Sequence, residues 1–301
     1  MILCAGEALI DMLPCEATTG GAGFAPHAGG SVFNTAIALG RLNTPVQFFS
    51  GLSSDLFGDI LRAELAASKV DSSPAHIADR PSTLAFVTLT DGHASYAFYD
   101  ENTAGRMLQP ADLPETQADA VFFGGISLVV EPCASAYAAM MDRVSDTSVT
   151  MIDPNIRPSF ITDEAAYRAR LTNMFASADI IKTSDEDLEW ITGGTDATAL
   201  FKGTNVQVIL LTRGSEGVTV LTRNGTAHVP AKKAKVVDTV GAGDTFSAGF
   251  LADLHAAGLL TKAALPHAAM SDLTKAAAFG AKVAAITVSR AGANPPWASE
   301  L

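Results

Sequence analysis

Short, almost uninterrupted apolar segments recur along the chain and limit the folds it can adopt. The clearest lie at residues 2–6, 120–126, 149–153, 179–184 and 206–212. Strands this apolar are typical of a parallel sheet that is covered on both faces. Helical patterns occur at residues 31–42, 55–68, 134–145, 163–176 and 185–192. The alternation predicts an α/β fold with a doubly wound, mostly parallel sheet. A predicted hairpin, 217–222 with 226–231, follows.

Two segments break this alternation. Residues 13–30 are rich in glycine and small residues, and residues 82–102 have the pattern of two strands around the sequence DGH. Together they predict a small second β-sheet, which could be a lid over a cleft or a plain edge hairpin. The expected division is a large α/β domain from residues 1–11, 31–81 and 105–301, and a small β lid from residues 12–30 and 82–104.

Composition excludes several classes of protein. Apolar residues make up 48% of the chain and charged residues 17%, which is typical of a globular protein. The net charge of −12 argues against a general nucleic-acid surface. Three widely spaced cysteines favour the reducing cytoplasm over a disulfide framework. The apolar start contains Glu7 and Asp11 and lacks a basic region, so we expect neither a signal peptide nor a membrane span.

The segment VVDTVGAGDTFSAGF, residues 236–250, places an aspartate directly behind a glycine turn. Phenylalanines recur four residues apart after this turn, so a helix starting near Gly243 would bury one stripe. The first amides of a helix lack intrahelical partners and carry partial positive charge, which suits a phosphate group. Asp244 could equally be an ordinary helix N-cap. Local chemistry alone leaves both interpretations open.

The full pattern D-T-x-G-A-G-D-x-F-x-A-G-F resembles the signature of the ribokinase-like (pfkB-type) carbohydrate kinases, and bacterial fructokinases in particular. The resemblance covers most of the chain and implies a three-layer αβα sandwich with a β lid. It also implies ATP-dependent phosphorylation of a sugar hydroxyl, with Asp244 as catalytic base and an anion hole at Gly241, Ala242 and Gly243. A carboxylate at a helix N-terminus should stay ionised, and such a weak base suffices in a loose transition state.

The same resemblance implies a set of sugar-binding residues. The segment GEALIDM places Asp11 just after the first strand, and GGSVFN supplies Gly29, Gly30 and Asn34. Asn34 is the lone amide among apolar residues at the start of a helix, and its burial without polar partners would be costly. The remaining implied sugar contacts are Phe98 in the lid, Glu131 and Asp244.

Three further segments resemble phosphate- and nucleotide-binding elements of the family. DPNIRPSF makes Arg157 a candidate for neutralising phosphate. KTSDEDLEW departs from the family's N-x-x-E element, because Ser184 and Asp187 replace the asparagine and the glutamate. Asp187 would then hold Mg²⁺ through water. The implied nucleotide contacts are Lys182, Ser184, Thr212, Arg213, Gly214, Gly241 and Gly243.

The run AAITVSRAGANPP, residues 284–296, resembles the family's monovalent-cation segment. The resemblance implies a K⁺ site in addition to ATP and Mg²⁺. Pro296 replaces a serine that is frequent in this segment, which removes one of the usual ligands. The implied ligands are the Asp238 side chain and the backbone carbonyls of Val240, Thr287, Arg290 and Gly292.

Several functions compete at this point. The segments DPNIR, YAFYDEN and SDEDLEW favour fructose as the acceptor, with 2-keto-3-deoxygluconate as the alternative. Ribose is less consistent, because the lysine of G-G-K-G-A-N is absent. A Rossmann dehydrogenase would require G-x-G-x-x-G after the first strand, where this chain has GEALID. A non-catalytic sugar- or nucleotide-binding module would not need Asp244. Because lids of this family often pair, a homodimer through the lid is a further expectation.

Overall fold

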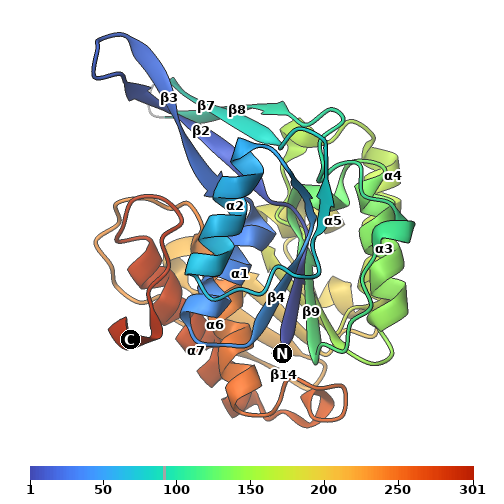
Figure 1. Cartoon of the computed structure of the whole chain (residues 1–301). Helices are drawn as coiled ribbons and strands as arrows, with labels where there is room; N and C mark the ends of the chain where they lie inside the picture. Colours follow the sequence, from blue (N-terminus) through green and yellow to red (C-terminus); the bar gives the residue numbers. More distant parts are fainter. Residues whose placement is uncertain (91–92) are drawn as a thin grey trace.

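A large, mostly parallel sheet forms the centre of the protein (Figure 1). The computed structural model describes residues 1–90 and 93–301, and the side chains of residues 88–96 are outside the described part. The strands follow the order β14-β13-β12-β11-β10-β9-β1-β4. Their bounds are β1 Ile2–Ala5, β4 Val46–Phe49, β9 Ala120–Gly124, β10 Val149–Asp153, β11 Ile180–Ser184, β12 Val208–Thr212, β13 Val218–Thr222 and β14 Gly225–Val229. All neighbours from β12 to β4 are parallel, and β13 and β14 form an antiparallel edge.

Helices cover both faces of this sheet, which confirms the predicted three-layer α/β sandwich. One face packs against α1 Ser31–Arg41, α2 Leu56–Ala67, α6 Ala242–Ala256 and α7 Met270–Thr287, and the other against α3 Cys133–Val144, α4 Glu164–Ser177 and α5 Asp185–Thr192. Successive strand residues serve the two cores in turn: Ile2 and Cys4 belong to one, Leu3 and Ala5 to the other. This alternation explains why the strands are apolar throughout.

Some elements are absent from the sequence prediction. Strand β4 is only four residues long and contains Gln47, so its pattern is weak. Helix α7 is rich in alanine and packs closely against α6, where its Gly280 and Gly249 of α6 bring the two backbones together. A two-stranded sheet, β5 Gly51–Ser53 with β6 His76–Ala78, also lies outside the predicted elements.

A separate sheet projects beyond the carboxyl end of β1, at the top of Figure 1. It has the order β3-β2-β7-β8 and is called the lid sheet below. Its strands are β2 Leu9–Glu16, β3 Ala22–Gly29, β7 Leu84–Thr90 and β8 His93–Tyr99. Residues 91 and 92 of the predicted DGH turn are outside the described residues. The lid sheet begins at Leu9, so Asp11 lies within it rather than in the large domain.

Two further observations concern the whole described chain. None of its helices has both the length and the apolar character required to cross a bilayer. Its three cysteines are free, with Cys4 and Cys133 buried and Cys15 exposed.

Candidate active site

A cavity of about 350 Å³ lies where the lid sheet meets the N-termini of α1 and α6. Asp11, Gly30, Asn34, Phe98, Arg157 and the turn from Gly241 to Asp244 are residues predicted from the sequence that line it. Val240, predicted as a cation ligand, also lines it, and the remaining lining residues are Glu7, Leu9, Ser31, Gly125, Ile126, Asn155, Ser159 and Thr239. Open α/β sheets bind ligands at the carboxyl ends of their strands, and this cavity has that position.

Asp244 is not the cap of its helix. Helix α6 begins at Ala242, and its N-cap is Gly241, whose φ of 75° suits glycine. Asp244 is the third helical residue, and its Oδ2 accepts a hydrogen bond of 2.9 Å from Asn34 Nδ2. The carboxylate therefore points into the cavity edge toward α1 instead of back to its own backbone. Of the two interpretations left open by local chemistry, the N-cap is excluded.

Burial dominates the protonation of Asp244. It raises the pKa of this carboxyl to about 6, although the Asn34 hydrogen bond lowers it. Asp153 and Lys182 act in opposite directions on the same group. The sequence-based expectation of a weak base is therefore wrong in degree, because desolvation outweighs the helix N-terminus. A pKa near the working pH makes Asp244 a better proton acceptor while leaving it mostly ionised at pH 7.

The turn before Asp244 presents backbone amides to the cavity. The first hydrogen bond of α6 runs from Thr245 N to Gly241 O at 2.9 Å, so the amides of Gly243 and Asp244 have no intrahelical acceptor. The Ala242 amide is partly engaged, at 3.3 Å from Thr239 O. These amides and the positive end of the helix dipole can stabilise a phosphoryl group in transfer.

Asp11 and Phe98 reach the cavity from strands β2 and β8 of the lid sheet, which lie on either side of β7. Both side chains share the inner face, because Ala85 lies opposite each of them in the strand register. Burial raises the pKa of Asp11 to about 6. Gly29 does not line the cavity, but a Cβ there would lie 2.3 Å from Asp11 Oδ2, so the glycine leaves space for this carboxylate. Phe98 is held by an edge-to-face contact with Phe160 at 4.8 Å.

Arg157 is the exposed cation of the cavity wall. Its Nη1 donates to the carbonyl oxygens of Ile156 and Asn155 at 3.0 and 3.4 Å. The rest of the guanidinium is open to an anionic ligand, and α6 presents its amides to the same cavity. An arginine with several donors beside such amides suits a phosphate ester.

Glu7 is a buried residue of the site that the sequence reasoning did not assign. Its carboxylate accepts from Ser31 N at 2.8 Å and from Val32 N at 3.4 Å, and so supplies the side-chain cap that Gly30 cannot give to α1. It also accepts from Ser127 N at 3.3 Å. Burial raises the pKa of Glu7 to about 7 despite these bonds. The sequence feature that could have identified Glu7 is its position as an acidic residue directly after an apolar strand.

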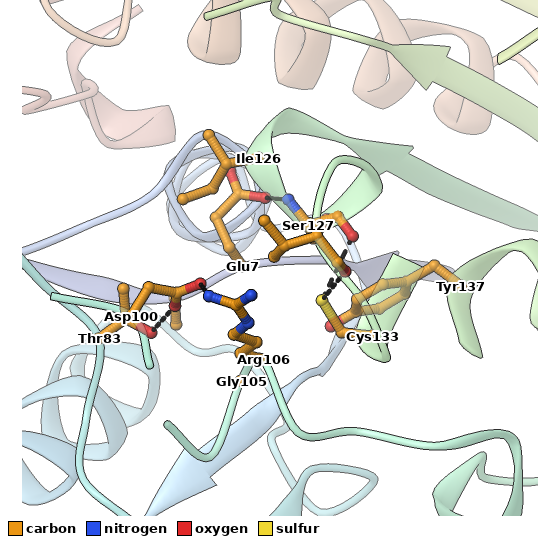
Figure 2. Close-up of a pocket in the computed structure, with 11 residues that line it drawn as sticks. Glu7, Thr83, Asp100, Gly105, Arg106, Ile126, Ser127, Cys133 and Tyr137 are labelled. Carbon is orange, nitrogen blue, oxygen red and sulfur yellow. Dashed lines mark hydrogen bonds and ion pairs between the residues drawn. The ribbon is translucent and has the colours of Figure 1, made fainter. Parts of the chain in front are cut away.

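Figure 2 shows the far side of Glu7, where a second cavity of about 20 Å³ has room for one water molecule. Asp100 and Arg106 lie on one side of it and Cys133 and Tyr137 on the other. Asp100 Oδ2 is buried and lacks a hydrogen bond within the described residues. This second cavity is too small for a sugar. Glu7 therefore lines the large cavity on one side and a well-packed region of the interior on the other.

The structure does not bring Glu131 to the large cavity. Its carboxylate forms an ion pair with Arg170 and accepts from Ser135 N at 3.2 Å, near the start of α3. Both interactions hold the loop before α3 in place. The predicted sugar contact at this residue is therefore not supported by the geometry.

Apart from Gly241 and Gly243, the residues predicted for nucleotide and Mg²⁺ lie outside the cavity lining. Lys182 is buried and forms an ion pair with Asp153, and Ser184 Oγ caps α5 by accepting from Asp187 N at 3.0 Å. Asp187 is buried, and its Oδ1 accepts from Ile156 N at 3.1 Å. Thr212, Arg213 and Gly214 follow one another at the carboxyl end of β12.

The residues predicted for K⁺ come from two segments that the structure joins. Asp238 accepts from Val240 N at 3.0 Å and from Gly292 N at 2.9 Å, so its carboxylate links both segments. The Thr287 carbonyl accepts from Arg290 N at 3.0 Å. The Arg290 side chain points to Glu300, which leaves only its backbone for an ion.

Comparison with known proteins identifies the family. The model of the pfkB family carbohydrate kinases matches residues 1–300. The chain belongs to this family. It is therefore a phosphotransferase that transfers phosphate from ATP to a sugar hydroxyl, which confirms the activity predicted from the sequence.

Similar proteins extend over almost the same length. A fructokinase from Rhizobium leguminosarum bv. trifolii is 52% identical over 267 residues, covering 87% of this chain and 82% of that protein. A probable fructokinase-2 from Arabidopsis thaliana is 33% identical, over 83% of this chain and 80% of its own. The crystal structure of a fructokinase with bound ATP from Xylella fastidiosa is 30% identical with a TM-score of 0.89, covering 97% and 93% of the two chains.

Proposed function

We propose that this kinase phosphorylates D-fructose, with Asp244 as the catalytic base. The observation that carries the proposal is one cavity in which a buried carboxylate, the amide-rich N-terminus of α6 and an arginine face the same space. The 52% identity to a bacterial fructokinase supports fructose as the acceptor. A non-catalytic binding module would not require a buried carboxylate with a raised pKa.

In this proposal the sugar lies between the lid sheet and α1. Asp11, from the lid, and Asn34, from α1, are the polar groups that orient its hydroxyl groups. Asp244 accepts the proton of the reacting hydroxyl, while the amides of Gly243 and Asp244 stabilise charge on the transferred phosphoryl group. Phe98 closes the apolar side of the cavity and helps to exclude water.

Mg²⁺ would enter this site with the nucleotide. Among the described residues no group of three or more His, Cys, Asp or Glu side chains could hold a metal ion. Magnesium commonly binds through one or two carboxylates, waters and substrate phosphates. A single nearby carboxylate, with the phosphates of ATP, is consistent with this mode of binding. Asp187 would contribute through water, and Thr212, Arg213 and Gly214 would lie on the nucleotide side, in the cytoplasm where ATP is available.

A panel of sugars with ATP and Mg²⁺ tests the substrate. Fructose should have the highest kcat/KM, and mass spectrometry of the product should show one added phosphate. If fructose is inert and 2-keto-3-deoxygluconate is turned over, the substrate proposal fails and the family assignment stands. ATP hydrolysis with no phosphorylated sugar from any member of the panel would contradict the kinase activity itself.

We also propose K⁺ binding between the two segments that Asp238 links. Its carboxylate and the nearby carbonyls of Thr287 and Gly292 are the hard oxygen donors that a potassium ion prefers. Replacing NaCl by KCl at constant ionic strength should raise kcat, and Asp238→Ala should remove the difference. Equal rates in both salts would exclude the site.

The outer face of the lid sheet suits a second copy of this chain. Phe24, Phe86 and Tyr99 form edge-to-face contacts at 5.0 and 5.4 Å on the side away from the cavity, and Tyr99 is 62% exposed. Strands β3 and β8 leave two unpaired edges, which are exposed pairing sites. Light scattering should give a dimer that Tyr99→Lys dissociates. A monomeric wild-type protein would refute this assembly.

A further inference from the structure

A buried ion pair lies beneath the phosphate-binding turn. Asp153 ends β10 and Lys182 lies in the neighbouring strand β11, and their side chains share the sheet face that α6 covers. Lys182 Nζ lies 2.7 Å from Asp153 Oδ2. Asp153 is fully buried and Lys182 is 5% exposed, so neither charge is solvated by bulk water. Burying such a pair is costly and calls for an explanation.

The positive end of this pair faces the turn. A Cβ on Gly243 would lie only 2.9 Å from Lys182 Nζ, so the ammonium packs directly against the backbone of this glycine. Any larger residue at position 243 would displace the lysine. The negative end, Asp153, lies level with Lys182 at the end of the neighbouring strand, and its Oδ1 has no hydrogen bond within the described residues.

We propose that Lys182 is a positioning residue that holds a positive charge behind the Gly241–Gly243 turn, with Asp153 as the counter-charge that keeps it there. The inference rests on the proposed anion hole and not on which sugar is bound. Charge that develops on the phosphoryl group would be stabilised by the amides in front and by the ammonium behind them. A fixed charge in a water-excluded site acts strongly because it needs no reorganisation.

The surrounding charges support this arrangement. Burial lowers the pKa of Lys182, but Asp153, Asp187 and Asp244 together raise it above its usual value, so the ammonium stays protonated. The three carboxylates come from β10, α5 and α6, which are different elements packed around one amine. The nucleotide-binding role predicted for Lys182 is replaced by one beneath the turn, because the side chain does not reach the cavity surface.

The test is the double variant Asp153→Asn/Lys182→Met, which removes both charges with little change in volume. Such neutral replacements often leave stability intact. We expect a thermal midpoint close to that of the wild type, a kcat for fructose lower by about 100-fold, and a fructose KM changed by less than about threefold. A folded double variant with kcat within about threefold of the wild type would overturn the proposal.

Two further variants separate catalysis from packing. Asp153→Asn alone keeps the ammonium, so kcat should stay within about tenfold of the wild type. The acidic limb of its pH–rate profile should move to lower pH, because the Asp153 charge raises the pKa of Asp244. If the double variant does not fold, Lys182→Gln decides, because it removes the ammonium that packs against Gly243; a folded Lys182→Gln enzyme with kcat within about threefold of the wild type refutes the proposal.

The matched control is Asp179→Asn/Lys262→Met, at the opposite end of β11, where Lys262 Nζ lies 2.6 Å from Asp179 Oδ2. It should leave kcat unchanged. An equal loss in this control would assign the effect to stability. Every variant is compared with the wild type. If fructose is not the substrate, the wild-type enzyme itself is inactive with fructose, and this result is distinct from a variant that keeps the wild-type rate.

Discussion

Asn34→Ala should shift the pH dependence of the enzyme by a predictable amount. Asn34 donates a 2.9 Å hydrogen bond to Asp244, and the two side chains are 8% and 7% exposed. A hydrogen bond to a charged group contributes about 1.5–3 kcal/mol. Because one pKa unit corresponds to about 1.4 kcal/mol, the loss should raise the pKa of Asp244 by about one to two units.

The direction of the pH shift follows from which protonation state of Asp244 is active. The proposed base must be ionised, so the acidic limb of kcat/KM should move from near pH 6 toward pH 7 to 8. At pH 7 the ionised fraction would fall to roughly a half to a tenth, and most of the lost rate should return at pH 9. Any loss of sugar contacts would lower the maximum of kcat/KM without changing the pH at which its acidic limb falls.

The assay is coupled ADP release over pH 5 to 9 with saturating ATP and varied fructose. Asn173→Ala is the matched control, because Asn173 is an exposed asparagine in helix α4. Its limb should coincide with that of the wild type. An acidic limb in Asn34→Ala that stays at the wild-type position would refute the link between this hydrogen bond and the base.

Two other outcomes are expected. Gly243→Ala should lower kcat more than it changes the ATP Kd from calorimetry, because its methyl group meets Lys182, and parallel changes in both would contradict this. Asp244→Asn should be more stable than the wild type at pH 7 by up to about 3 kcal/mol, because the raised pKa of this carboxyl makes ionisation unfavourable for folding. That gain should vanish near pH 3, where the carboxyl is largely protonated in both the folded and the unfolded state, and a gain that persists there would contradict the reasoning.

The sequence predicted the sheet and most helices, because fully buried strands and amphipathic helices leave simple periodic patterns. It failed for β4 and α7, where four residues or a run of small ones carry too little pattern. Within the site, Asp244 and its turn could be identified from a long local signature. Asp11, Asn34 and Arg157 followed from segments of the same family, and all three line one cavity.

What the sequence could not give is the pairing of distant charges. Nothing local in the sequence reveals that Lys182 meets Asp153, or that Glu131 meets Arg170 and so leaves the cavity. Both outcomes depend on which strands become neighbours and on how deeply each side chain is buried. The raised pKa of Asp244 has the same origin, since burial is a property of the folded chain.

Phosphoryl transfer by Asp244→Asn tests the central claim most directly. With fructose, Mg²⁺ and labelled ATP, the variant should form sugar phosphate at least about 1,000-fold more slowly than the wild type, while its ATP affinity stays within about threefold. The side chains are nearly equal in size, so only the proton acceptor is lost. A variant that transfers phosphate at the wild-type rate would show that Asp244 is not the base.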